Sequence, residues 1–99
     1  NEIIRLPEEV CELPKLRSLF LNANPLEALP KNMHQLSELR QVNLSYCPIE
    51  QLPKTLALIK KLSFLALSYT KKLKRLPKEL FQPLRLNYLS LEGSAITRQ

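Results

Sequence analysis

The sequence predicts a single α/β solenoid that occupies the whole chain, residues 1–99. Two observations support this fold class. Leucine occurs 23 times and recurs at a fixed spacing, and four of the eight prolines follow a leucine at the same place in that pattern. We therefore expect a right-handed superhelix with short parallel strands on its concave face and short helices or irregular turns on its convex face.

The expected strands are marked by a six-residue core in which the first, fourth and sixth residues are aliphatic. These cores occupy residues 16–21, 39–44, 62–67 and 86–91, and their starts lie 23, 23 and 24 residues apart. Side chains alternate between the two faces of a strand, so the two closely spaced aliphatic residues of each core point to the same side. Each core therefore predicts one short strand with a single buried face.

A small polar residue follows each core at a constant distance, where the chain is expected to turn. These residues are Asn24, Cys47, Thr70 and Ser94. Their side chains can form hydrogen bonds with backbone groups of the neighbouring turn, although cysteine forms the weakest ones. We therefore expect this position to connect each coil to the next.

The expected convex segments begin at four Leu-Pro pairs, residues 6–7, 29–30, 52–53 and 76–77. Proline suits the first position of a short helix, because its missing N–H group costs nothing there. The segments 31–39 and 54–62 are therefore expected to form one or two helical turns. One extra residue lies between Thr70 and Leu86, and the stretch 81–84 leaves its position open.

This pattern resembles the leucine-rich repeat family in its 23-residue form, LxxLxLxxNxLxxLPxxLxxL, from Ile3 to about Ile96. Only Asn24 is the consensus asparagine. The resemblance implies stacked coils with a concave face that binds proteins. The repeats are similar to those of intracellular scaffolds, plant immune receptors and bacterial effectors, and the sequence does not choose among them. We expect a cytoplasmic protein, or alternatively an effector secreted into a host cell.

The two ends of the array carry no recognisable polar cap, and residues 1–15 begin within a repeat. Solenoids usually need such caps, because each coil buries its apolar face only against the next one. We therefore expect the chain to be a fragment of a longer array or protein. The alternative is self-association through the uncapped ends.

The side chains that flank the inward leucines are expected on the concave face, and five of the six aromatic residues fall there. Of the sixteen positions concerned, only Glu92 is charged. Aromatic residues among Ser, Asn and Gln resemble a protein-binding surface, although they can also stack simply as cross-strand neighbours. The candidate partner-binding residues are Phe20, Asn22, Gln41, Asn43, Tyr46, Phe64, Tyr69, Tyr88 and Glu92.

Positive charge is concentrated in the second half of the chain. Residues 1–50 carry five basic and seven acidic side chains, whereas residues 51–99 carry ten basic and two acidic ones. The basic patch comprises Lys71, Lys72, Lys74, Arg75 and Lys78. Its alternation with leucines favours a solvated edge of the solenoid, with an acidic protein surface as the second interpretation. A membrane or a nucleic acid is the least favoured interpretation, and the run lacks the interleaved aromatic residues of proteins that bind single-stranded nucleic acid.

Catalytic and metal-binding motifs are missing from the sequence. A single glycine, Gly93, excludes a glycine-rich phosphate loop, and one histidine with two cysteines cannot supply the four ligands of a structural zinc site. His34 lies in a variable convex position and is expected at the surface. Cys11 is expected on the convex side, where nothing activates it as a nucleophile. We expect neither an enzyme nor a cofactor.

The sequence thus predicts a non-catalytic protein–protein interaction module that binds a partner, of unknown identity, through its concave aromatic and polar face. The alternative is a structural or regulatory segment that packs on the flanking domains of a larger protein, such as a bacterial effector or an immune receptor.

Overall fold

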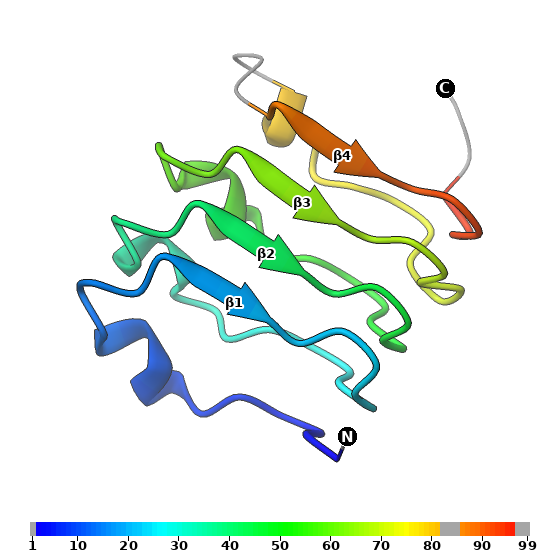
Figure 1. Cartoon of the computed structure of the whole chain (residues 1–99), viewed down its shortest axis with the longest axis horizontal. Helices are drawn as coiled ribbons and strands as arrows, with labels where there is room; N and C mark the ends of the chain where they lie inside the picture. Colours follow the sequence, from blue (N-terminus) through cyan, green and yellow to red (C-terminus); the bar gives the residue numbers. More distant parts are fainter. Residues whose placement is uncertain (1, 82–85, 97–99) are drawn as a thin grey trace.

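Four short strands form one parallel sheet in the computed structural model, which describes residues 2–81 and 86–96 (Figure 1). The strands pair in sequence order, with Leu19, Val42, Leu65 and Leu89 in register. They are β1 (Ser18–Phe20), β2 (Gln41–Asn43), β3 (Phe64–Ala66) and β4 (Tyr88–Ser90). The expected solenoid of parallel strands is therefore confirmed, and each strand lies within its predicted core.

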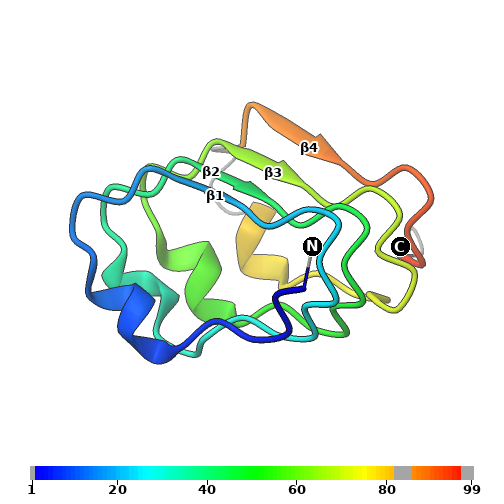
Figure 2. The same cartoon turned by 60° about the horizontal axis from the view of Figure 1, so that its bottom comes forward.

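Four 3-10 helices lie on one side of the sheet, which is the predicted convex side (Figure 2). The opposite side of the sheet, which is the predicted concave face, is named the outer face below. The four helices are η1 (Glu8–Glu12), η2 (Met33–Gln35), η3 (Lys54–Leu58) and η4 (Lys78–Phe81). Pro7 and Pro53 are the N-cap residues of η1 and η3 and have extended backbone angles, so each lies one position before the first helical position that the sequence predicted. The helices are shorter than the predicted segments, because Leu36 and Ile59 are buried and carry the chain back toward the sheet after about one turn.

The core fills the space between the sheet and the 3-10 helices with one leucine-rich layer per coil. Leu26, Leu44, Leu56 and Leu65 are fully buried. Burying such a side chain contributes about 1.5–3 kcal/mol relative to leaving it exposed. In the last coil, Leu89 and Leu91 are only partly buried against this core, so the interior coils carry most of the apolar stabilisation.

Asn24 and Cys47 form the predicted hydrogen bonds to the neighbouring coil, whereas the bonds of Thr70 and Ser94 stay within their own coils. The Asn24 amide donates to the Leu21 carbonyl at 2.9 Å, and its oxygen accepts a bond from the Ile3 backbone N–H at 3.0 Å. Cys47 Sγ lies 3.1 Å from the Leu21 carbonyl oxygen in the preceding coil. Thr70 Oγ1 donates to the Leu67 carbonyl at 2.7 Å. These bonds satisfy buried backbone groups at each turn, which explains why a polar side chain recurs there.

The extra residue of the third repeat lies in a turn formed by Lys71 and Lys72, which the Leu73 N–H closes onto the Thr70 carbonyl at 3.1 Å. In the two preceding coils a single proline, Pro25 or Pro48, separates the polar turn residue from the next buried aliphatic residue. The insertion therefore adds a lysine to an exposed turn. Of the stretch 81–84, which left the position of the extra residue open in the sequence, residues 82–84 lie outside the described residues.

Candidate functional site

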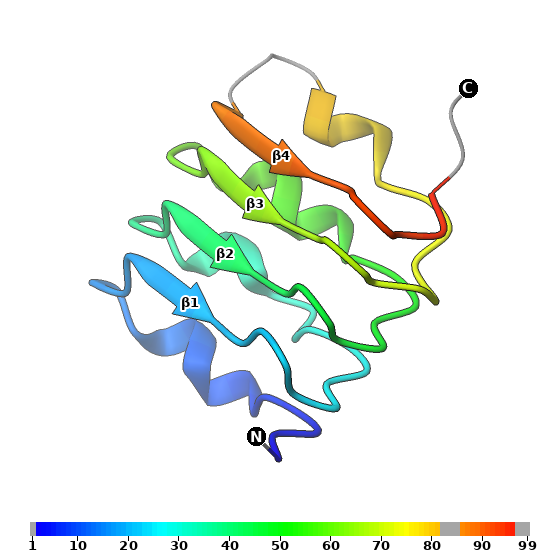
Figure 3. The same ribbon diagram turned by 45° about the vertical axis from the view of Figure 1, so that its right-hand side comes forward.

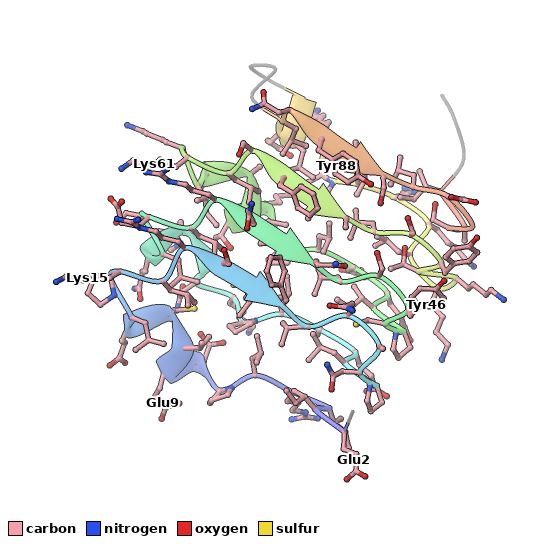
Figure 4. The ribbon with its side chains drawn as sticks, viewed as in Figure 1. Glu2, Glu9, Lys15, Tyr46, Lys61 and Tyr88 are labelled. Carbon is pink, nitrogen blue, oxygen red and sulfur yellow. The ribbon has the colours of Figure 1, made fainter. Side chains whose placement is uncertain are left out.

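The outer face of the sheet presents two rows of side chains that point away from the core. The strand register aligns Ser18, Gln41, Phe64 and Tyr88 in one row, and Phe20, Asn43, Ala66 and Ser90 in the other. Phe20 and Tyr88 remain 59% and 48% exposed, and the Tyr88 side chain stands on the outer side of β4 (Figure 4). Several predicted binding residues therefore share one accessible surface.

The first row contains a stacked aromatic pair between β3 and β4. The rings of Phe64 and Tyr88 lie 4.5 Å apart between centroids and are inclined by 9°. Phe64 is half-buried by this contact, whereas Tyr88 keeps about half of its surface open. The cross-strand stacking considered from the sequence is thus present here, and it leaves a rigid apolar platform exposed to solvent.

A second aromatic pair lies beyond the strands, on the stacked turns that follow β2 and β3 (Figure 3). Tyr46 and Tyr69 have ring centroids 4.9 Å apart and an interplanar angle of 14°. Both backbones are left-handed, with φ of 65° and 59°, as are Ala23 and Gly93 at the equivalent positions of the other coils. This conformation costs a non-glycine residue about 1–2 kcal/mol. The sequence did not predict this left-handed backbone, because tyrosine rarely adopts it.

Backbone hydrogen bonds between coils hold these turns in the left-handed conformation. The N–H groups of Ala23 and Tyr46 donate to the carbonyls of Ser45 and Ser68 at 2.9 Å each, and the Tyr69 N–H donates to the Glu92 carbonyl at 2.6 Å. The Tyr69 hydroxyl also donates to Glu92 Oε2 at 3.2 Å. This bond to a carboxylate raises the pKa of Tyr69 above its ordinary value of 10.0.

Several polar side chains of the outer face are engaged within the sheet. The Ser18 hydroxyl donates to Gln41 Oε1 at 2.9 Å, and the Ser45 hydroxyl oxygen accepts a bond from the Ser68 N–H at 3.1 Å. Ser45 and Ala66 are buried, although the sequence placed both on the concave face. Of the predicted binding residues, three are half-buried and six are exposed. The half-buried ones are Asn43, Phe64 and Tyr69, and the exposed ones are Phe20, Asn22, Gln41, Tyr46, Tyr88 and Glu92.

The basic patch lies away from this surface, on the segment that returns from β3 to η4. Four of its members line an open groove of about 720 Å³: Lys71, Lys72, Lys74 and Arg75. The opposite lining comes from the preceding coil and includes Glu50 and Lys54, whereas Lys78 is not part of it. Sequence reasoning missed Lys54. The available signal was its position directly after a Leu-Pro pair, which it shares with Lys31 and Lys78.

The remaining candidate groups do not form a reactive site in the described part of the chain. Cys11 and Cys47 are buried free thiols, and burial raises the pKa of both above 9.0. His34 is exposed, as predicted. Among residues 2–81 and 86–96, no group of three His, Cys, Asp or Glu side chains is arranged to hold a metal ion, and no helix is long and apolar enough to cross a membrane.

Comparisons with known proteins identify the fold. No family model matches the sequence, and no curated protein matches it. Among solved structures, the leucine-rich repeat domain of the type III effector XopL is similar, with a TM-score of 0.77 and 23% identity. The match covers 94% of this chain and 34% of the other, so the chain spans about a third of that length. The protein therefore has the leucine-rich-repeat fold expected from its repeats.

Proposed function

We propose that this protein is a non-catalytic interaction module that binds a protein partner through the outer face of its sheet. The observation that supports this most strongly is the exposure of three aromatic side chains on the sheet and the turn that follows β2: Phe20 and Tyr88 on β1 and β4 at 59% and 48%, and Tyr46 on that turn at 62%. Exposed aromatic side chains have large contact areas and lose little conformational entropy on binding. Leucine-rich-repeat folds commonly serve protein interaction, which agrees with this assignment.

The stacked pairs prepare this face for binding. Because Tyr46 rests on Tyr69, and Tyr88 on Phe64, both exposed rings are held in place before a partner arrives. A preorganised contact avoids part of the entropy cost of immobilising side chains. Phe20 lies on β1, in the same row as Asn43 of β2, and extends the surface to the first strand. Asn22, Gln41 and Glu92 supply exposed hydrogen-bonding groups around these rings.

The experiment is affinity capture from an extract of the source cells, with the bound proteins quantified by mass spectrometry. The test variant is Phe20→Ala with Tyr46→Ala, and the control variant is Leu58→Ala with Leu13→Ala. The pairs are matched, because Phe20 and Leu58 are both 59% exposed while Tyr46 and Leu13 are 62% and 50% exposed. Leu58 and Leu13 lie in and directly after the 3-10 helices, away from the outer face of the sheet.

We expect one or a few proteins to be captured by the wild-type chain and the control variant but lost from the test variant. Thermal melts of both variants serve to exclude unfolding as the cause. Equal capture by the two variants, or equal loss from both, would contradict binding through this face.

A further inference from the structure

The groove lies between the segment that follows β2 and the segment that follows β3, and its lining carries more positive than negative side chains. Five exposed cations line it, against one carboxylate: Lys54, Lys71, Lys72, Lys74 and Arg75 against Glu50. In the part of the chain that the structure describes, ion pairing is confined to Lys61 and Glu38. Among the described residues, therefore, none of the five cations has a carboxylate within ion-pairing distance. An anionic group that enters the groove gains attraction from several cations at once.

The extra residue of the third repeat contributes directly to this groove. Lys71 and Lys72 form an exposed turn in place of the single proline of the two preceding coils. The turn contributes two positive charges to the lining of the groove. Lys74 and Arg75 continue the same wall, with buried Leu73 anchoring the segment between them and the turn. The cationic side chains of this segment therefore extend from a backbone that is anchored to the core.

The lining of the groove also includes three apolar residues. Leu52 is buried there, and Leu76 and Pro77 are half-buried. Anionic membranes also attract clustered cations, but a bilayer surface makes its apolar contacts with protruding side chains, whereas the apolar residues of this lining are buried or half-buried. Proteins that bind single-stranded nucleic acid stack its bases on aromatic side chains, and no aromatic residue is among the lining residues of the groove. Cations beside apolar lining residues fit a chain that alternates acidic and apolar residues.

We infer that this groove is a second binding site, which takes an extended acidic segment of a protein. Its Asp or Glu side chains pair with the five cations, while its apolar side chains contact Leu76 and Pro77. A volume of about 720 Å³ accommodates a few residues of such a segment. The groove shares no residue with the outer face of the sheet, so the inference does not depend on the proposed function of that face.

Fluorescence anisotropy with a labelled peptide of alternating Glu and Leu residues tests this site. The groove variant is Lys72→Glu with Arg75→Glu. The matched control is Lys15→Glu with Lys60→Glu, which changes the net charge equally at exposed residues outside the groove. Comparison ligands are the same peptide with Gln for Glu, a single-stranded oligonucleotide of equal charge, and phosphatidylserine vesicles. Phe20→Ala with Tyr46→Ala separates this site from the outer face.

We expect saturable binding of the acidic peptide that weakens as salt is added. The groove variant should bind about tenfold or more weakly, because two attractive contacts become repulsive. The control and the outer-face variant should retain the wild-type affinity, and the Gln peptide should not bind. The inference is overturned if the acidic peptide does not bind, if both charge-reversal variants weaken equally, or if the oligonucleotide or the vesicles bind as tightly.

Discussion

Replacing Gly93 by alanine should reveal how the tyrosine stack is coupled to the last described turn. Gly93 has φ of 72°, and a Cβ at this position would overlap the Tyr69 ring, lying 2.5 Å from Cε1 and 3.0 Å from Cγ. Real Cβ atoms essentially never come closer than 3.0 Å. The ring must therefore move. The stack of Tyr69 on Tyr46 and the hydrogen bond from Tyr69 to Glu92 both depend on its present position.

Two contributions set the magnitude for Gly93→Ala. The left-handed conformation costs alanine about 1 kcal/mol relative to glycine. Displacement of the ring from its stacked partner adds about 1 kcal/mol, as typical for an aromatic pair. We therefore expect the free energy of unfolding to fall by about 2 kcal/mol. For a chain of this size, that corresponds to a decrease in melting temperature of about 10 °C.

A double-mutant cycle with Tyr69→Ala separates the two contributions. Once the ring is removed, Gly93→Ala should cost only the conformational part, so the two substitutions should be non-additive by about 1 kcal/mol. Urea unfolding followed by circular dichroism measures each free energy. Additive effects would refute the steric coupling, and an unchanged stability of Gly93→Ala would refute the left-handed strain as well.

Three further results are expected. Leu65→Ala should lower the free energy of unfolding by about 2–5 kcal/mol, since this side chain is fully buried; partly buried Leu89→Ala should cost less in the same urea titrations. Burial raises the pKa of Cys47 above 9.0, so its contribution to stability is complete below pH 9.0 and is lost as the pH rises through the folded-state pKa. Urea unfolding at increasing pH should show this decline, and Cys47→Ala should reduce it. Glu92→Gln should lower the pKa of Tyr69 toward 10.0, measured by NMR titration of the ring, because the carboxylate acceptor is removed.

The periodic part of the structure could be predicted because each coil repeats the same physical requirement. Leu19, Val42 and Leu65 occupy one inward position at a constant spacing, so the spacing itself sets the strand register. The polar turn residues could be predicted for the same reason, since every coil must satisfy buried backbone groups there. Even Cys47 in place of asparagine forms its bond, to the Leu21 carbonyl.

Features that depend on contacts between neighbouring coils could not be predicted from the repeat pattern of the sequence. The groove was missed because Lys54 and Lys72 are distant in sequence and line one depression only once the coils are stacked. The burial of Ala66 was missed because alternation along a strand predicts which face a side chain occupies but not how far neighbouring side chains cover it. That coverage depends on contacts between neighbouring coils, as the stacking of Phe64 on Tyr88 illustrates.

The left-handed turns bear on the proposed function of the outer face. Glycine adopts this conformation without the penalty that a side chain incurs, and Gly93 does so in the fourth coil. Tyr46 instead has a strained backbone, and its side chain stays 62% exposed. The partial burial of its ring against Tyr69 therefore offsets only part of the conformational cost. Folding stability alone therefore gives little reason for tyrosine at this position. Residues that depart from a local conformational rule without a compensating gain in stability tend to lie at functional sites. Tyr46 fits that description better than any other predicted binding residue that the structure describes, and it is where we expect a partner to make contact.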